Sequence, residues 1–128
     1  MTTNKYTFYQ SLDEFTTSYI ESLLWSETDN ANESGGEPLD RNYDWSDFTL
    51  EALHKIKNDC KAFQEQNAEL LTQAGDDDQN GHDFCLTRNG HGAGFWDRGY
   101  GDVGDKLTQA CRPYGEMNVT VYRGKLYV

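Results

Sequence analysis

The chain has 128 residues, with 22 acidic and 11 basic side chains that give a formal net charge of −11. This length predicts a single domain over residues 1–128, and 8 Tyr, 6 Phe and 3 Trp supply large side chains for its core. No apolar run is long enough for a membrane span or a signal peptide, so we expect a cytoplasmic protein. The excess of acids argues against direct nucleic-acid binding, which needs clustered Lys and Arg.

The first third of the sequence predicts an amphipathic helix followed by a long acidic loop. A short extended piece at Tyr6–Tyr9 precedes a helix at about 11–25, which begins with a capping box of Ser11 and Glu14. The next 20 residues, 26–45, are rich in Asn, Ser, Gly and acids. A loop of this length in a small domain has either a functional reason or a lack of fixed structure.

Acids and aromatics are mixed at the end of this loop and at the start of the next helix. This mixture is more typical of a protein contact surface than of a plain linker. We therefore predict a partner-binding surface there, made of Asp40, Tyr43, Asp44, Trp45, Asp47 and Glu51.

A second helix is predicted over about 47–73, with Ser46 as its cap and Gly75 as its stop, because apolar residues recur every three or four positions. It completes an acidic, helical part of the chain. Residues 1–75 hold 14 acids and 5 bases (net −9), and residues 76–128 hold 8 acids and 6 bases (net −2). The negative charge therefore belongs mainly to the N-terminal half.

The second half predicts a small sheet. A polar turn at 76–81 leads to a strand at 82–88, in which apolar and polar residues alternate. Asp102 or Asp105 is predicted to cap a short helix that runs to about Tyr114 and ends at Gly115, and two strands, 117–122 and 125–128, form a hairpin. The expected fold class is α+β, with N-terminal helices packed on an antiparallel sheet of strand 82–88 and the C-terminal hairpin 117–128.

Three cysteines, Cys60, Cys85 and Cys111, are far apart in the sequence and form no Cys-x-x-Cys pair. An odd, dispersed set in a chain without an export signal is typical of reduced thiols. We expect them to be small buried side chains of the core.

Residues 82–99, HDFCLTRNGHGAGFWDRG, concentrate histidines, acids, arginines and glycines. Three interpretations stay open. In the first, His82, Asp83, His91 and Asp97 bind zinc, with Cys85 as a further ligand, because imidazole, carboxylate and thiolate are zinc ligands. In the second, Asp83 or Asp97 orients His91 as a general base. In the third, Arg88 and Arg98 pair with Asp83 and Asp97, and the segment organises the fold.

The segment resembles a pattern found in small accessory proteins of bacteriophages, prophages and plasmids, HDFxLTRNxHGxGFWDRG followed by a GDxL helix. The resemblance covers about residues 82–107, and the sequence departs from it at Cys85, where an aromatic residue is common. It implies a phage or mobile-element protein. Some such proteins inhibit host defence systems, anti-CRISPR proteins among them.

These observations lead to two main functional hypotheses. In the first, the protein is a phage-derived, non-enzymatic inhibitor that binds a host defence nuclease, such as a CRISPR or restriction effector, through its acidic surface. In the second, it is a small zinc enzyme or zinc-stabilised module centred on His82–Asp97. A module that binds other phage proteins is a third reading that the sequence does not separate from the first.

Overall fold

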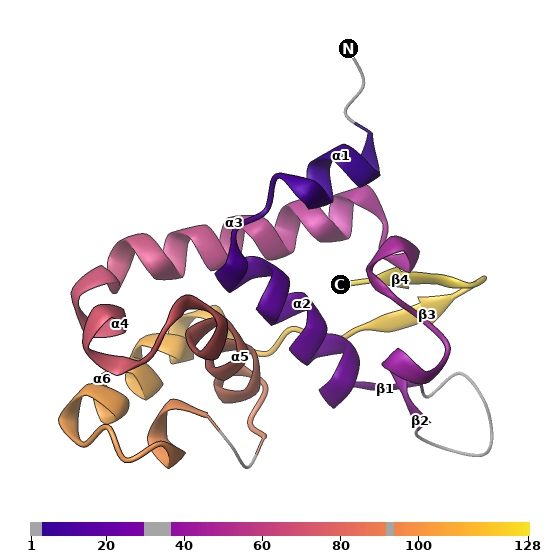
Figure 1. The fold of residues 1–128 in the computed structure, drawn as a ribbon. Helices are drawn as coiled ribbons and strands as arrows, with labels where there is room; N and C mark the ends of the chain where they lie inside the picture. The colour runs from indigo at the N-terminus through magenta and orange to yellow at the C-terminus, as the bar shows by residue number, and fades with distance from the viewer. Residues whose placement is uncertain (1–3, 30–36, 92–93) are drawn as a thin grey trace.

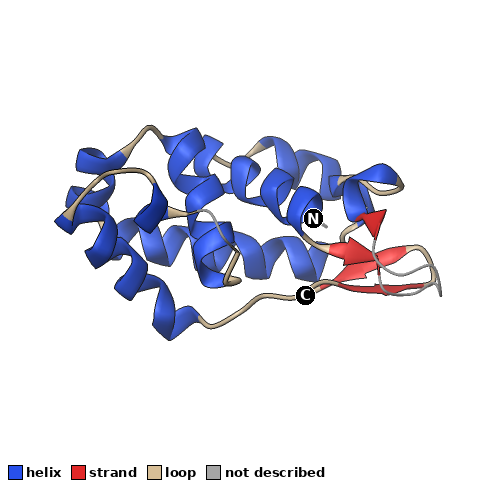
Figure 2. Ribbon diagram, turned by 90° about the horizontal axis from the view of Figure 1, so that it is seen from below, coloured by secondary structure: helices blue, strands red, loops and turns tan. Residues whose placement is uncertain are grey.

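The computed structural model describes residues 4–29, 37–91 and 94–128. The helices of this part are α1 (Lys5–Gln10), α2 (Glu14–Ser26), α3 (Leu50–Gln66), α4 (Ala68–Ala74), α5 (Asp77–Arg88) and α6 (Asp102–Cys111). Two antiparallel pairs of short strands accompany them: β1 (Thr28–Asp29) with β2 (Glu37–Pro38), and β3 (Thr120–Tyr122) with β4 (Lys125–Tyr127). The strands gather at one end of the molecule (Figure 2). The α+β class is confirmed.

Four single-turn 3-10 helices complete the described elements. They are η1 (Leu39–Arg41), η2 (Trp45–Asp47), η3 (Phe95–Asp97) and η4 (Arg112–Tyr114). Part of the predicted loop 26–45 therefore has regular structure, and its residues 30–36 lie outside the described ranges. No helix of the described residues has the length and apolar character needed to cross a membrane.

The N-terminal segment contains two helices where the sequence pattern predicted one. The extended piece at Tyr6–Tyr9 was wrong, because these residues lie in α1, which runs beside the start of α3 (Figure 1). The capping box at Ser11 was also wrong. Ser11 ends α1 by donating its hydroxyl proton to the Phe8 carbonyl, and Asp13 caps α2 by accepting from the Thr16 amide at 2.8 Å.

The predicted second helix is divided into α3 and α4. Thr49, rather than Ser46, caps α3, and the helix breaks at Asn67, whose side-chain amide donates to the Phe63 carbonyl at 2.9 Å. An Asn side chain that satisfies a terminal carbonyl stabilises a helix end locally. Gly75 ends α4 as predicted.

The strand predicted at 82–88 was wrong, because these residues form the last two turns of α5. The helix begins at Asp76, which accepts from the Gln79 amide at 2.8 Å, so the predicted polar turn 76–81 is its cap and first turn. The central residues of α5 are buried on nearly all sides, including the polar Asp83 and Arg88. A helix without a polar face lacks the 3.6-residue periodicity that identifies helices. The predicted pairing of 82–88 with the C-terminal hairpin was therefore wrong as well.

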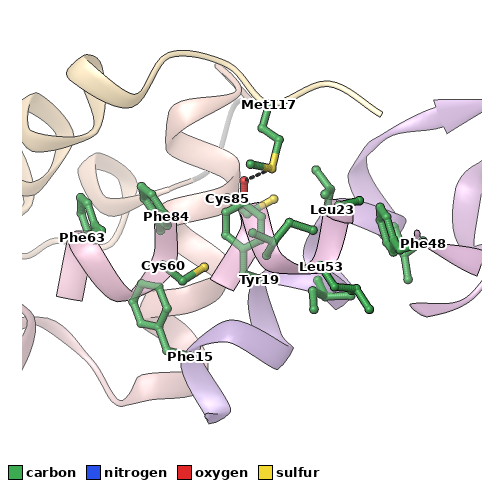
Figure 3. Packing of buried hydrophobic residues seen from close by; sticks show 14 of the residues in the cluster. Phe15, Tyr19, Leu23, Phe48, Leu53, Cys60, Phe63, Phe84, Cys85 and Met117 are labelled. Carbon is green, nitrogen blue, oxygen red and sulfur yellow. Dashed lines mark hydrogen bonds between the residues drawn. The ribbon is translucent and has the colours of Figure 1, made fainter. Parts of the chain in front are cut away.

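Gly81 allows α5 to pack very closely on α2. A Cβ atom at this position would come far inside contact distance of the Phe15 main-chain carbonyl, so only glycine fits. Around this crossing, the Phe63 and Phe84 rings stack with centroids 4.1 Å apart (Figure 3). The core of the molecule is thus built where α2, α3 and α5 meet.

The C-terminal helix and hairpin are present as predicted, but two details were wrong. The N-cap of α6 is Gly101, which has no side chain to cap with, rather than Asp102 or Asp105, and β3 begins at Thr120 rather than at residue 117. Helix α6 and η4 end at Gly115, and β3 and β4 form the expected hairpin. Its turn residues Arg123 and Gly124 have φ angles of 50° and 75°, the left-handed backbone that two-residue hairpin turns prefer. The hairpin is tied to the start of α3, because the Thr49 amide donates to the Leu126 carbonyl at 3.1 Å.

Candidate functional site

The motif segment 82–99 places Asp83 and Arg88 in buried contacts. Asp83 on α5 is fully buried, and its carboxylate accepts three hydrogen bonds of 2.9–3.3 Å from the Arg98 guanidinium and one of 3.0 Å from Gln79. The hydrogen bond to Asp83 raises the pKa of Arg98, so the arginine stays charged. This pair fixes the segment after η3 against α5.

Arg88, at the end of α5, connects four parts of the chain. Its guanidinium donates to the carbonyls of Tyr114 and Gly115, each at 2.9 Å, to the Tyr19 hydroxyl at 3.2 Å and to the Asp59 carboxylate at 3.0 Å. Burial disfavours its charged form, but the interactions with Tyr19 and Asp59 outweigh this and raise the pKa of Arg88. Arg88 therefore pairs with Asp59 on α3, and not with Asp83 or Asp97.

Two further motif residues hold the turns on either side of the undescribed residues 92–93. The Thr87 hydroxyl accepts from the Phe95 amide at 3.1 Å, and the space beside it is available only because residue 94 is glycine. The Asn89 side-chain oxygen accepts from the Met117 amide at 2.7 Å. Met117 in turn accepts a hydrogen bond from the buried Tyr19 hydroxyl at 3.3 Å (Figure 3).

The four predicted zinc ligands are not brought together. His82 contacts Ser22, Asp83 is bound to Arg98, and Asp97 is exposed on η3. The His91 amide donates to the Leu86 carbonyl. Its ring lies near Glu27, whose pKa is raised by burial in spite of the opposing effect of His91. In the described ranges, no three His, Cys, Asp or Glu side chains are grouped in a way that would hold a metal ion.

His82 and Ser22 form the one contact in this part that resembles a histidine–nucleophile pair. The Ser22 hydroxyl is 2.6 Å from His82 Nδ1 and donates to the Ser18 carbonyl at 2.8 Å. Because a hydroxyl has a single proton, Ser22 cannot donate to the Ser18 carbonyl and to His82 Nδ1 at the same time. The serine is buried, and its contact with the carbonyl competes with the hydrogen bond that a nucleophilic serine donates to its histidine.

The three cysteines are free and buried, as predicted. Burial raises the pKa of each thiol, to about 12 for Cys111. Cys85, the further zinc ligand considered above, faces the core near Tyr19 (Figure 3). All three are therefore protonated and unreactive in the folded protein.

Comparison with protein-family models, curated proteins and solved structures finds no match to this chain. The arrangement of the chain's own residues is therefore the evidence for its function. The motif segment contributes mostly internal contacts, so the exposed acidic residues are the stronger candidates for a binding surface.

The predicted partner surface is ordered around η2. Asp44 and Asp47 form a reciprocal capping box: Asp44 accepts from the Ser46 amide at 2.8 Å, and Asp47 accepts from the Asp44 amide at 2.9 Å. The hydrogen bonds from Ser46 lower the pKa of Asp44, which therefore stays ionised. Asp40 and Glu51 are exposed and flank this turn in the sequence, and Tyr43 is half-buried against the core.

Helix α1 supports the η2 turn. Trp45 stacks on Tyr9, with ring centroids 4.1 Å apart and planes inclined by 7°, and it contacts Tyr6 at 6.1 Å. Lys5 donates to the carbonyls of Ser46 and Phe48. These α1 residues were not among the predicted contact residues, because an extended segment was predicted there. Their aromatic side chains could have indicated a place in the contact surface.

Carboxylates near η2 act on the Tyr9 hydroxyl. Burial raises the pKa of Tyr9, and the carboxylates of Glu21 on α2 and Asp44 raise it further. Of the six predicted partner-binding residues, none forms an ion pair with a described residue. We call Asp40, Tyr43, Asp44, Trp45, Asp47 and Glu51, together with Tyr6 and Tyr9, the η2 surface.

Proposed function

We propose that this protein is a phage- or mobile-element-derived inhibitor of a host defence nuclease, such as a CRISPR or restriction effector. It acts in the host cytoplasm by binding the nuclease through the η2 surface, and it contacts no nucleic acid. The basic channel that loads nucleic acid attracts the acidic surface, so inhibitor and nucleic acid compete for one region.

One observation supports this proposal above the others. The carboxylates of the η2 surface are free of ion pairs, while the turn that carries them is held by a capping box and an aromatic stack. A preorganised turn loses little conformational entropy on binding. Its carboxylates form no ion pair, although the Lys5 charge acts on Asp44, and they can contact a basic partner. The exposed aromatic edge of Tyr6 adds the kind of side chain that is enriched at interfaces.

The zinc alternative has no comparable support. Its four residues lie in separate contacts, and two of them, Asp83 and His82, already have protein partners. We assign the motif segment a structural part in the inhibitor, because its buried polar contacts fix α5, η3 and the segment before β3 relative to one another.

The test is inhibition of nucleic-acid cleavage by purified nucleases of the relevant host, together with direct binding measured at low and high salt. The double variant Asp44→Asn/Asp47→Asn removes two charges but keeps side-chain oxygens for the caps. Asp102→Asn/Asp105→Asn makes the same change on α6 and is the matched control. We expect binding to weaken steeply with salt and with the first variant only.

Equal weakening by the two variants would contradict a specific η2 surface. Failure of every such nuclease to bind at low ionic strength would overturn the proposed function itself.

A further inference from the structure

A second feature lies on the outer side of the contact between α2 and α5. A surface groove of about 420 Å³ is lined there by Glu21, Ser22 and Trp25 of α2 and by Asp78 and His82 of α5, among others. Trp25 is 58% exposed, although it belongs to the most closely packed helix pair of the protein. A large aromatic side chain exposed beside a groove is typical of an interaction site.

The groove combines two carboxylates with an exposed indole. Glu21 and Asp78 carry exposed carboxylates, and neither forms an ion pair with a described residue. The His82 ring lies beside Trp25, with ring centroids 6.0 Å apart, and its Nδ1 is 2.6 Å from the Ser22 hydroxyl. The lining therefore carries negative charge next to an aromatic side chain that is largely open to solvent.

This combination fits a cation with several N–H donors. A guanidinium group can lie flat on an indole ring and donate in its plane to carboxylates on both sides, whereas an ammonium group is a compact, strongly hydrated charge. We propose that the groove is a binding site for an arginine side chain of a protein partner, stacked on Trp25 between Glu21 and Asp78.

Glu21 links the groove electrostatically with the η2 surface. Burial raises the pKa of Tyr9, the carboxylates of Glu21 and Asp44 raise it further, and Tyr9 stacks on Trp45. One partner could therefore contact both regions. The biological use of the arginine site rests on the proposed function, but binding of the arginine side chain itself is a separate property that needs no nuclease.

The experiment is a titration of the full chain, labelled with ¹⁵N, with arginine blocked as N-acetyl and N-methylamide. The indole N–H signals of Trp25, Trp45 and Trp96 report separately, and Trp96 is the matched reference because it is 52% exposed. We expect saturable movement of the Trp25 signal and little movement of the Trp96 signal. Blocked citrulline, which has the same shape without the charge, should move neither.

Variants make the assignment specific. Glu21→Gln and Trp25→Ala should each weaken the binding of blocked arginine by roughly two- to fivefold. The backbone amide signals of α2 and α5 measure this binding in both variants. Glu14→Gln, an exposed glutamate of the same helix, should leave it unchanged. Blocked lysine should bind more weakly than arginine.

Three results would each overturn the site: citrulline as effective as arginine, lysine as effective as arginine, or Glu21→Gln without effect. If blocked arginine binds as described but no nuclease does, the proposed function fails and the arginine site stands. If a nuclease binds but blocked arginine does not, the arginine site is rejected and the proposed inhibitor function stands.

Discussion

Two regions of this small protein use the same residue types in opposite ways. In the motif segment, Asp83, Arg88 and Arg98 are paired inside the protein, and their charges hold elements together. On the η2 surface, Asp44 and Asp47 face solvent, and their hydrogen bonds stay within one turn. The motif segment 82–99 therefore has a structural role, whereas the acidic residues around η2 have the features of a protein interface.

Removal of the buried arginine is expected to have the largest effect on stability. Arg88→Met should lower the free energy of unfolding by about 3–5 kcal/mol, because it leaves the partly buried Asp59 carboxylate and two carbonyls without their donor. Urea denaturation measures the loss. Arg112→Met, an exposed arginine of η4, should cost less than about 1 kcal/mol. A similar small loss for Arg88→Met would mean that the motif does not hold the fold.

The close contact of α2 with α5 gives the next largest effect. Gly81→Ala should destabilise the protein by about 2–3 kcal/mol or more, because the added methyl group forces the two helices apart at the Phe15 carbonyl. Gly90→Ala is the control: its φ is +72° but its surroundings are open, so we expect only about 1 kcal/mol. Thermal unfolding of both variants compares the effect of steric crowding with that of backbone strain. Equal losses of stability would contradict the close approach of Gly81 to the Phe15 carbonyl.

The Asp83–Arg98 pair should respond unequally to loss of either partner. Arg98→Ala leaves a fully buried carboxylate with Gln79 as its remaining partner, and we expect a loss of about 2 kcal/mol in the free energy of unfolding. Asp83→Asn should lower the free energy of unfolding by less, because the Arg98 side chain is 31% exposed and can be solvated by water. Urea denaturation of both variants and of Asp97→Asn, an exposed control, tests the order. A larger loss for Asp83→Asn would contradict it.

The smallest effect is expected for the cap of α2. Burial opposes ionisation of Asp13, but hydrogen bonds from Thr16 and Gln64 outweigh it and lower its pKa. The folded state thus binds this proton more weakly than the unfolded chain. The stabilisation is complete above the ordinary carboxyl range near pH 4 and is lost as the pH falls below it.

Asp13→Asn keeps a capping oxygen, so it should change stability at neutral pH by only a few tenths of a kcal/mol, whereas Asp13→Ala should cost about 1 kcal/mol. Denaturation midpoints at neutral pH and at about pH 3 should then show a smaller acid loss for Asp13→Asn than for the original protein. An unchanged acid loss would show that other carboxylates dominate.

Much of the helix and hairpin content could be predicted from local sequence. The apolar rhythm of 50–66, the stop at Gly75 and the two strands around Arg123–Gly124 are local signals, and the structure contains the matching elements. Helix α5 could not be predicted in this way, because burial of both apolar and charged residues removed its periodic pattern. The acid caps at Asp13 and Asp76 were visible in the sequence and were misread, since Ser11 and a polar run offered competing interpretations.

The candidate site could likewise be predicted only in part from local sequence. The acids and aromatics of residues 40–51 could be grouped from sequence because neighbours in a short turn stay neighbours in space. The contributions of Tyr9, Glu21 and the Trp25 groove could not, since they depend on how α1, α2 and α5 pack. Likewise, the partner of Arg88 lies 29 residues away, a distance over which spacing rules carry no information.

The excess of negative charge, its concentration in residues 1–75, the burial of the three cysteines and the C-terminal hairpin could be predicted from the sequence alone, because they follow from composition or from contacts between near neighbours. Which charges are paired depended on the tertiary structure. Packing around α5 paired Asp83 with Arg98 and Arg88 with Asp59, whereas the carboxylates of η2 and of the Trp25 groove form no ion pair with a described residue.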